Sequence, residues 1–425
     1  MKITELHSIF LKFPKVCTDT RKITNDCIFF ALKGDNFNGN KFASDALQKG
    51  AKYAVIDEKR YAESDAYLLV EDVLKSLQEL ASYHRNYVTA KVIALTGSNG
   101  KTTTKELINK VLSKKYKTIA TVGNLNNHIG VPLTLLSIRP DTEIAIVEMG
   151  ANHQKEIEFL CTIAQPDFGY ITNFGKAHLE GFGSEAGIIK GKSELYDYLL
   201  SNERSVFLNA DDLIQFEKLS SYIKKFGFST AKHQFYNIEF LGADPFVRIK
   251  VEDLDINSQL IGSYNFTNCA VAILIGKYFN VSLQDVKSAI ESYAPKNNRS
   301  QLLEKNGHRI ILDAYNANPT SMQAALENFR SMQGQNKIAF LGDMFELGDT
   351  AFKEHQDISD LAIQLDFSDV YLIGENFKKA HTSAKTFKSF EEVAEYLKKH
   401  PLANKSNVLI KGSRGMALER LLDIL

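Results

Sequence analysis

The sequence contains no tryptophan, and it has few prolines and cysteines for its length. Its 425 residues include 8 prolines and 4 cysteines. The cysteines Cys17, Cys27, Cys161 and Cys269 form no Cys-x-x-Cys pair, which argues against a disulfide framework and against a zinc site. We therefore expect buried or incidental thiols in the reducing environment of the cytoplasm.

The chain also lacks an excess of charge and any long hydrophobic run. Its 51 basic residues balance 51 acidic ones, so no broad nucleic-acid-binding or membrane-binding surface is expected. No apolar run approaches the length of a membrane span, and residues 1–13 have no signal-peptide core. A content of 44% hydrophobic and 24% charged residues is typical of a globular protein, and the length predicts two to four domains.

The strongest motif lies between residues 92 and 106. The apolar run 92–95 predicts a buried strand, and the periodicity from Thr102 onward predicts a helix. Between them, Gly97 and Gly100 allow backbone N–H groups to approach an anion, and Lys101 adds a positive charge. The Thr102 hydroxyl can reach a magnesium ion. Two residues separate the glycines, against four in the general phosphate loop, so an ordinary strand-to-helix turn is the alternative.

The order of predicted strands and helices divides the chain into three α/β regions. Residues 1–85 predict a small α/β unit. Residues 86–296 alternate short strands with helices, as in a doubly wound, mostly parallel sheet with a P-loop. The alternation restarts in residues 297–425 as a Rossmann-like unit without a phosphate loop. Pro295–Arg299 is the predicted linker before this last unit.

Predicted strands of the middle region end in residues that can bind a metal ion. Glu148 follows one strand and His178 lies just beyond another, so both are expected at the sheet edge where α/β proteins bind ligands. Both are plausible magnesium ligands; the alternatives are a helix N-terminal acid and a surface histidine. The lysine segment 190–192 has three interpretations: a counter-charge to the phosphates, a lysine carbamylated by carbon dioxide that would act as an anionic ligand, or a solvated side chain. The sequence does not distinguish Lys192 from Lys190 as the modified residue.

Three further polar clusters either bind a ligand or stabilise local structure. Asn126 and Asn127 lie in a loop before an apolar run, and a simple turn is the alternative. Asn265 and Asn268 are three residues apart and are expected to share a helical face, with helix capping as the alternative. From the residues alone, we interpret the polar segment 18–21 as a capped turn with an exposed arginine.

Taken together, these residues resemble the Mur ligase family of cell-wall enzymes over essentially the whole chain. Residues 96–104 are similar to the shortened phosphate loop of that family, which accounts for the short glycine spacing. The other matching segments follow in the family's order: Glu148-Met-Gly, the His178 loop, the Lys192 segment, Asn265-x-x-Asn268, Arg299, Asp313 and Ser413-Arg414. The ordered set is more specific than any single motif.

Within this family, the sequence is most similar to the member that adds a dipeptide. The segments that resemble it are Gly123–Asn127, Ala177–Gly183, Asp313–Pro319, Leu341–Gly348 and Lys411–Arg414. The Asp-Asn-Pro-Arg motif of the sibling that adds the third amino acid is absent from the sequence. Tyr264 is a departure, because many members have a histidine before the asparagine, so the packing of the nucleotide base there is expected to differ.

The resemblance implies a three-domain, ATP-dependent ligase of peptidoglycan precursor synthesis. The first domain would hold a uridine nucleotide, the second ATP and two magnesium ions, and the third the incoming dipeptide. ATP would phosphorylate the free carboxylate of UDP-N-acetylmuramoyl tripeptide, and the amine of D-alanyl-D-alanine would then displace phosphate. We expect a cytoplasmic monomer. The identity of the third amino acid of the tripeptide is not encoded in any recognisable motif.

The resemblance also assigns a role to each matching residue. The catalytic residues would be Lys101, Glu148, His178 and Lys192. The magnesium ligands would be Thr102, Glu148, His178 and a carbamylated Lys192. The nucleotide-binding residues would be Gly97, Ser98, Asn99, Gly100, Lys101, Thr102, Thr103, Asn265, Asn268, Arg299 and Asn316. The substrate-binding residues would be Thr18, Asp19, Thr20, Arg21, Asn126, Asn127, Asp343, Ser413 and Arg414, which replaces the capped-turn interpretation of residues 18–21.

Three other functions are compatible with parts of the sequence. A folate polyglutamylating ligase shares the ATP chemistry, but the full N-terminal unit with Asp19 and Arg21 argues against it. A nucleotide-regulated binding protein without turnover is disfavoured by the presence of Lys101, Glu148 and Lys192 together. A P-loop kinase would give a phosphorylated product and no peptide bond.

Overall fold

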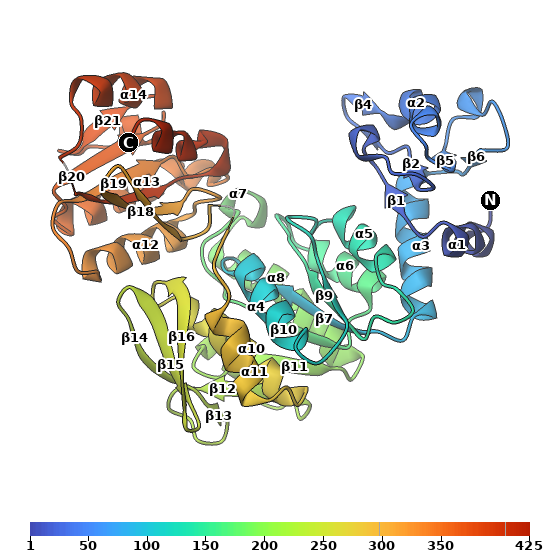
Figure 1. The fold of residues 1–425 in the computed structure, drawn as a ribbon, viewed down its shortest axis with the longest axis horizontal. Coiled ribbons are helices and arrows are strands. Elements are labelled where there is room, and N and C mark those ends of the chain that lie inside the picture. The colour runs from blue at the N-terminus through green and yellow to red at the C-terminus, as the bar shows by residue number, and fades with distance from the viewer. Residues whose placement is uncertain (297, 404) are drawn as a thin grey trace.

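The computed structural model describes residues 1–296, 298–403 and 405–425. It contains three α/β domains, each built on its own sheet of four, seven or six strands. Figure 1 shows the N-terminal domain in blue and the C-terminal domain in orange and red, on opposite sides of the central domain. The predicted three-domain α/β fold is therefore confirmed. The residue limits of the domains stay a prediction, and position 297 of the predicted linker lies outside the described residues.

The N-terminal domain is a four-stranded parallel sheet with the order β1-β2-β5-β6. Its strands are β1 (Val16–Cys17), β2 (Ile28–Phe30), β5 (Tyr53–Ile56) and β6 (Tyr67–Leu69), with a small hairpin of β3 (Lys33–Gly34) and β4 (Phe37–Asn38). Its helices are α1 (Ile3–Lys12) and α2 (Ala43–Gln48). Helix α3 (Val73–Tyr87) starts at an Asp72 cap and leads into the central domain.

The central domain is a seven-stranded parallel sheet with the order β13-β12-β11-β10-β7-β9-β8. Its strands are β7 (Lys91–Thr96), β8 (Thr118–Ala120), β9 (Ile144–Glu148), β10 (Phe168–Ile171), β11 (Ser205–Asn209), β12 (Lys225–Ser229) and β13 (Tyr236–Asn237). The strand order reverses at β7, because β9 lies on one side of it and β10 on the other. This reversal is where open α/β sheets bind ligands, at the carboxyl ends of the strands.

Helices cover both faces of this sheet because β7 is apolar on both faces. Ile93 and Leu95 face one core with α4 (Lys101–Leu112) and α10 (Asn265–Tyr278). Val92 and Ala94 face the other core, which includes residues of α5, α6 and α8. The remaining helices of the domain are α5 (Gly130–Leu136), α6 (Glu156–Ala164), α7 (Leu179–Phe182), α8 (Glu185–Ser201), α9 (Leu213–Lys218) and α11 (Leu283–Glu291).

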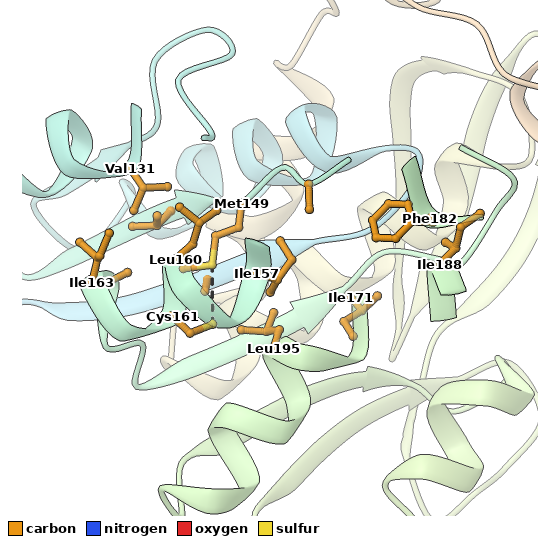
Figure 2. Packing of buried hydrophobic residues seen from close by; sticks show 14 of the residues in the cluster. Val131, Met149, Ile157, Leu160, Cys161, Ile163, Ile171, Phe182, Ile188 and Leu195 are labelled. Carbon is orange, nitrogen blue, oxygen red and sulfur yellow. Dashed lines mark hydrogen bonds between the residues drawn. The ribbon is translucent and has the colours of Figure 1, made fainter. Parts of the chain in front are cut away.

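The second of these cores is shown in Figure 2. Met149, Ile157, Leu160 and Leu195 are buried together, and the sulfur of Cys161 lies 3.9 Å from that of Met149. Burial raises the pKa of the Cys161 thiol, so this cysteine is a packing residue rather than a nucleophile. The apolar packing fixes the segment that follows β9, which borders the cavity described below.

An antiparallel sheet in the central domain was not predicted from the sequence. It consists of β14 (Glu239–Ala243), β15 (Phe246–Val251) and β16 (Leu254–Ile261). Its signal is visible in retrospect, because buried and exposed residues alternate along β15 and a turn at 252–253 separates it from β16. The expectation of a mostly parallel domain holds for the seven-stranded sheet, to which this small sheet is added.

The C-terminal domain is a six-stranded sheet with the order β17-β18-β22-β19-β20-β21. All neighbours are parallel except β17, which is antiparallel to β18. Its strands are β17 (Gln301–Lys305), β18 (His308–Asp313), β19 (Lys337–Gly342), β20 (Asp369–Ile373), β21 (Lys385–Phe387) and β22 (Asn407–Lys411). Its helices are α12 (Pro319–Ser331), α13 (Ala351–Gln364) and α14 (Phe390–Lys399). Across the described parts of the chain, no helix is both long and apolar enough to cross a membrane.

Candidate active site

A cavity of about 890 Å³ lies at the carboxyl end of β7 and is bordered by elements of all three domains. The central domain contributes residues 98–103, Glu148 and the start of α10. The C-terminal domain contributes several residues between 313 and 324 and Lys411, and α3 contributes Gln78. A cavity of this volume is large enough for a nucleotide and part of a second substrate.

The phosphate loop between β7 and α4 requires glycine at both predicted positions. Gly97 has a φ of +140°, and a Cβ there would lie 2.0 Å from Oγ1 of Thr172. Gly100 has a φ of +81°, and a Cβ there would lie 2.6 Å from Oδ1 of Asn268. The loop therefore packs tightly against its neighbours while α4 presents its N-terminal N–H groups to the cavity, as an anion site requires.

The polar side chains of the loop face toward the same space. Lys101 Nζ donates to the carbonyls of Gly97, at 2.6 Å, and Ser98, at 3.1 Å. Burial lowers the pKa of Lys101, and the nearby Glu148 opposes that shift. The buried Ser98 hydroxyl has no hydrogen-bond partner among the described residues. A lysine and an unsatisfied hydroxyl beside a helix N-terminus fit the phosphates of a nucleotide.

Glu148 at the end of β9 is held by the first turn of α4 and by the loop before α5. One carboxylate oxygen accepts a hydrogen bond from the Thr102 hydroxyl at 2.9 Å, and the other accepts one from Asn126 Nδ2 at 2.8 Å. Its backbone N–H donates to Oγ1 of Thr121 at 2.9 Å. A buried carboxylate and a hydroxyl beside the phosphate loop are hard oxygen donors, so Thr102 and Glu148 fit a magnesium ion. Asn126 acts here as a partner of Glu148.

The two candidate lysines for carbamylation differ in burial. Lys190 is exposed, whereas Lys192 is fully buried. Lys192 Nζ donates to the carbonyl of Ala151 at 2.9 Å and lies 4.8 Å from the ring centre of Phe182. Burial, together with the charge of Lys101, lowers its pKa well below the usual value. The neutral amine is the form that reacts with carbon dioxide, and a lowered pKa favours that form, so Lys192 fits the modification better than the exposed Lys190.

His178 lines the cavity at the start of α7. Its backbone has a φ of +53°, which is uncommon for a residue other than glycine. Its Nδ1 lies 2.5 Å from Oε2 of Glu346 in the C-terminal domain. The described residues include no cluster of three His, Cys, Asp or Glu side chains that could hold a metal ion. A site there would combine Glu148 and His178 with other groups, such as Thr102 and Lys192.

The predicted asparagine pair at the start of α10 connects this helix to the phosphate loop. Asn268 Nδ2 donates to Oδ1 of Asn265 at 2.8 Å, and the Thr104 hydroxyl donates to Oδ1 of Asn268 at 3.0 Å. Asn265 Nδ2 donates to the carbonyl of Ile261 at 2.7 Å, so neither side chain caps the helix. Both amides are buried and line the cavity. Their hydrogen bonds, with that of Thr104, hold α10 in register with α4.

The C-terminal wall of the cavity is built around Tyr315. The guanidinium of Arg299 lies 3.6 Å from the ring centre of Tyr315, and that of Arg414 lies 5.2 Å from it. The neighbouring Asn316 also lines the cavity. Lys411 forms an ion pair with Asp313, and both line the same wall. Arg299 therefore supplies positive charge to this wall, whereas Arg414 does not border the cavity.

A chain of hydrogen bonds crosses from the central domain into this wall. The Tyr264 hydroxyl and the Ser300 hydroxyl are 3.0 Å apart, and the Ser300 N–H donates to Oδ1 of Asp313 at 3.0 Å. Tyr264, the residue that departs from the family pattern, is partly buried, and its burial raises the pKa of its phenol. It therefore acts as a neutral hydroxyl that joins α10 to the C-terminal domain.

The predicted substrate residues of the N-terminal domain do not border this cavity. Asp19 accepts hydrogen bonds from Arg21 Nε, at 2.9 Å, and from Arg21 Nη2, at 2.8 Å. It also accepts one from the Arg21 N–H at 3.0 Å, as a cap of the short helix η1 (Thr20–Lys22). The Arg21 side chain holds the pKa of Asp19 at about 2. The local structure is a capped turn, and the substrate-binding role of Thr18, Asp19, Thr20 and Arg21 stays a prediction.

Three other predicted substrate residues shape loops. Asp343 is buried and accepts hydrogen bonds from the N–H groups of residues 376 and 377, at 2.9 and 3.0 Å. The Ser413 hydroxyl accepts one from the Phe345 N–H at 3.0 Å. Asn127 lines the cavity, but its Oδ1 accepts hydrogen bonds from the N–H groups of residues 129 and 130 at the start of α5. Their contacts with substrate stay predictions.

Several cavity residues were not identified from the sequence, among them Asn318, Tyr315 and Gln78. Asn318 Nδ2 donates to Oδ1 of Asn99 at 2.7 Å, which connects α12 to the phosphate loop. Asn318 and Pro319 form a standard helix start, so the sequence pattern indicated only helix capping and not the contact with Asn99. Tyr315 lies in the same loop after β18. Gln78 is a single polar residue on α3, and no local sequence pattern indicated that it borders the cavity.

Comparisons with known proteins agree with this geometry. Family models described as "Mur ligase family, catalytic domain", "Mur ligase middle domain" and "Mur ligase, glutamate ligase domain" match residues 13–94, 95–276 and 298–414. The UDP-N-acetylmuramoyl-tripeptide–D-alanyl-D-alanine ligase of Bacillus subtilis is 35% identical, over 96% of this chain and 92% of that protein. The enzyme of the same name from Escherichia coli is 32% identical, over 99% of this chain and 95% of that protein.

Solved structures show the same similarity. A crystal structure of MurF from Acinetobacter baumannii has a TM-score of 0.83 at 32% identity, over 96% of this chain and 92% of that one. The MurF ligase of Thermotoga maritima, solved in complex with ADP, has a TM-score of 0.84 at 26% identity, over 97% of both chains. With the phosphate loop, the Glu148 contacts and the three sheets in place, the chain belongs to the Mur ligase family.

Proposed function

We propose that this chain joins the free carboxylate of UDP-N-acetylmuramoyl tripeptide to the amine of D-alanyl-D-alanine, with conversion of ATP to ADP and phosphate. The curated relatives that bear the name of this reaction match the chain over nearly its full length. The observation on which the proposal mainly rests is the cavity at which the phosphate loop, Glu148 and Arg299 meet. The product is a UDP-N-acetylmuramoyl pentapeptide, a precursor of peptidoglycan.

The residues around the phosphate loop suit the first step, in which the carboxylate attacks the γ-phosphate of ATP. An ionised carboxylate is a poor acyl donor, so its oxygen must first become part of a better leaving group. Attack of one anion on another requires fixed positive charge and hydrogen-bond donors. Lys101 and the N–H groups of α4 hold the phosphates, and Arg299 offsets charge from the opposite wall. Bound magnesium, held by Thr102 and Glu148, would further neutralise the triphosphate.

Lys192 would complete a second metal site as a carbamate. Carbon dioxide adds to the neutral amine, a new N–C bond forms and one proton is released, so a buried neutral amine becomes an anionic carbamate. The lowered pKa of Lys192 and its full burial support this step. His178 and Glu148 would be the remaining protein ligands of that site. Mass analysis under native conditions, with and without bicarbonate, tests the modification, and Lys190→Arg serves as the control.

The second step is attack of the dipeptide amine on the acyl phosphate. The tetrahedral intermediate collapses, the C–O bond to phosphate breaks and the amine proton is released. Water competes with the amine, so the cavity must be closed to solvent during this step. We propose that the C-terminal domain moves on the Pro295–Arg299 linker to close it. Small-angle scattering with an ATP analogue and both substrates should show compaction, and an unchanged profile would count against closure.

The reaction itself is tested by phosphate release from ATP with UDP-N-acetylmuramoyl tripeptide, with and without D-alanyl-D-alanine. We expect phosphate release that depends on the dipeptide, together with a pentapeptide product identified by mass. Lys101→Ala should reduce this turnover by about 10³-fold or more, because it removes a fixed positive charge at the transferred phosphoryl group. ATP turnover without the pentapeptide would direct the search to other carboxylate and amine pairs.

A further inference from the structure

Two residues in a strained backbone conformation face each other across the boundary between the central and C-terminal domains. His178, at the start of α7, has a φ of +53°, and Glu346, in the loop after β19, has a φ of +61°. Nδ1 of His178 lies 2.5 Å from Oε2 of Glu346. The N–H of Glu180, in the first turn of α7, donates to the backbone carbonyl of Glu346 at 3.1 Å.

Left-handed backbone is uncommon for histidine and glutamate, and it persists where surrounding contacts hold it in place. These contacts are present on both sides of the boundary. Leu179 and Phe182 of α7 belong to the same apolar cluster as Leu347. The short helix η4 (Gly348–Thr350) packs against α7, and Gly348 lies close to Glu180. Both residues are thus held in position by the docking of the two domains.

The contact gives the two nitrogens of the His178 ring different roles. Nδ1 is buried, and Glu346 is the acceptor beside it. An ionised carboxylate only accepts hydrogen bonds, so the proton of a neutral ring belongs on Nδ1. Among the described residues Nδ1 has no other partner, and the contact lies off the angle of an ideal hydrogen bond. The contact with His178 also lowers the pKa of Glu346. Nε2 is left without a proton and available to the cavity that His178 lines.

We propose that Glu346 is a positioning residue that fixes His178 as its Nδ1–H tautomer, with the Nε2 lone pair free for the reaction in the cavity. Glu346 does not border the cavity, so it acts through His178. Because Glu346 belongs to the C-terminal domain, His178 is set correctly only when the two domains are docked. This inference rests on the proposed function, since it assumes that His178 takes part in the ligase reaction.

A second contact across the same boundary provides a matched control. Lys176 Nζ lies 3.2 Å from Oε1 of Glu354, which is also in the C-terminal domain. This pair holds the same two domains together and lies two residues from His178 in the sequence, but it does not touch the imidazole ring. Glu354→Gln therefore weakens docking without removing the acceptor beside Nδ1. Glu346→Ala removes that acceptor, and Glu346→Gln keeps an acceptor oxygen without the charge.

The tautomer is measured by nitrogen NMR of the full chain labelled at its histidine rings, with His178→Gln used to assign the signal. We expect the Nδ1–H pattern in the unchanged protein and in Glu346→Gln. In Glu354→Gln we expect at most a partial loss of it, because weaker docking separates Glu346 from His178 in only part of the molecules. In Glu346→Ala, the signal should move toward the Nε2–H form that free imidazole prefers. The Glu346 side chain is 49% exposed, so these variants should fold, and thermal unfolding of each variant checks this.

Turnover provides the second measurement. Carboxylates that orient a functional histidine affect activity by about 10–100-fold. We expect Glu346→Ala to lower kcat within that range with little change in KM for ATP, and Glu346→Gln to recover most of the loss. An unchanged His178 tautomer in Glu346→Ala would overturn the inference, as would an unchanged kcat. Absence of ligase activity in the unchanged protein would instead contradict the proposed function, while the NMR result would still report on the contact.

Discussion

The central domain meets its two neighbours in different ways. At the N-terminal junction, the regular helix α3 packs against α1 on one side and against α5 and α6 of the central domain on the other. At the C-terminal junction, the polar contacts come from loops and short segments: Asn99 with Asn318, Lys176 with Glu354, and His178 with Glu346. Figure 1 shows α3 entering the central domain as one continuous helix.

The polar contacts at the N-terminal junction are dense and buried. Arg85 of α3 donates to the carbonyls of residues 164 and 165, both at 3.1 Å, and pairs with Asp167 at 2.8 Å. Both side chains of this pair are 12% exposed. The neighbouring His84 donates from Nε2 to the carbonyl of Ile138 at 3.0 Å. This junction is an extension of the central core, so we expect it to stay formed as long as the domain is folded.

The contacts at the C-terminal junction are single pairs between segments that could separate without unfolding either sheet. Most of the cavity lies at this junction. Catalytic groups are often found where two units meet, because relative motion then admits substrates and excludes water. The comparison leads to a general expectation: changes at the N-terminal junction lower stability, and changes at the C-terminal junction alter activity or shape.

The largest effect on stability is expected from Arg85→Ala. Removal of this side chain leaves the nearly buried carboxylate of Asp167 without its main partner. It also leaves the carbonyls of residues 164 and 165 without their donor. Loss of one partner of a buried pair should lower the free energy of unfolding by about 3 kcal/mol. Urea unfolding measures this change. The control is Arg204→Ala, because Arg204 also approaches Asp167, at 3.4 Å, but is 48% exposed. If Arg85→Ala and Arg204→Ala lower the free energy of unfolding equally, the N-terminal junction is not distinguished from the C-terminal one by its buried ion pair.

The second-largest effect is the dependence of stability on pH, which arises at the same N-terminal junction. His7 Nε2 and His84 Nδ1 are 3.1 Å apart, and because His84 Nε2 donates to a carbonyl, the His84 Nδ1 must accept from His7. Burial lowers the pKa of both histidines in the folded chain. The unfolded chain then binds more protons as the pH falls below about 6.5. Stability contributed by the neutral pair is therefore present above that pH and is lost in acid.

This prediction is checked by the free energy of unfolding measured between pH 5 and pH 8. His7→Gln keeps a donor for His84 but does not titrate, so its stability should depend less on pH over that range. His233→Gln is the matched control, because His233 is exposed. A slope that His7→Gln leaves unchanged would show that the pair does not stabilise the α1–α3 contact.

The sequence predicted well those parts of the site that depend on neighbouring residues in the chain. The phosphate loop, the α10 asparagine pair and the polar residues after β9 each follow from a local pattern of glycines, periodicity or strand ends. The local structure at Asp19 was also predictable, because a cap needs only the next two residues. The topological reversal at β7 then brings these local elements to one edge of the sheet.

The parts that were not predicted depend on contacts between distant segments. Glu346 and His178 are far apart in sequence, and neither position shows a periodicity or turn pattern that indicates the other. The same holds for Gln78, whose place at the cavity depends on how α3 packs against α5. Asp343 was assigned to substrate binding from the family pattern, and its buried carboxylate also binds backbone N–H groups of its own domain, which the sequence did not indicate. Strand-end position alone does not determine which way a side chain points.

At the C-terminal junction, Glu354→Gln should change shape more than stability. Glu354 is buried and pairs with Lys176, so loss of its charge should weaken docking of the domains by about 1 kcal/mol. Small-angle scattering should show a larger radius of gyration, while urea unfolding changes little. Glu185→Gln is the control, because Glu185 approaches the same Lys176 at 3.4 Å but is 65% exposed and lies in the central domain. Expansion in both variants would mean that the charge of Lys176, rather than the pair across the boundary, determines the shape.

The smallest effect is expected from Tyr264→Phe, which removes one hydroxyl from the same junction. The ring stays packed, and the loss is limited to the hydrogen bond with Ser300, which is worth about 1 kcal/mol. Because Ser300 also bonds Asp313 in the cavity wall, this loss should raise KM for ATP about fivefold, with kcat nearly unchanged. Ser300→Ala should have a similar effect. If the two hydroxyls act through one bond, the double variant will be no worse than either single variant. Additive losses would mean that Tyr264 and Ser300 contact the nucleotide site independently, and that this bond does not couple the two domains.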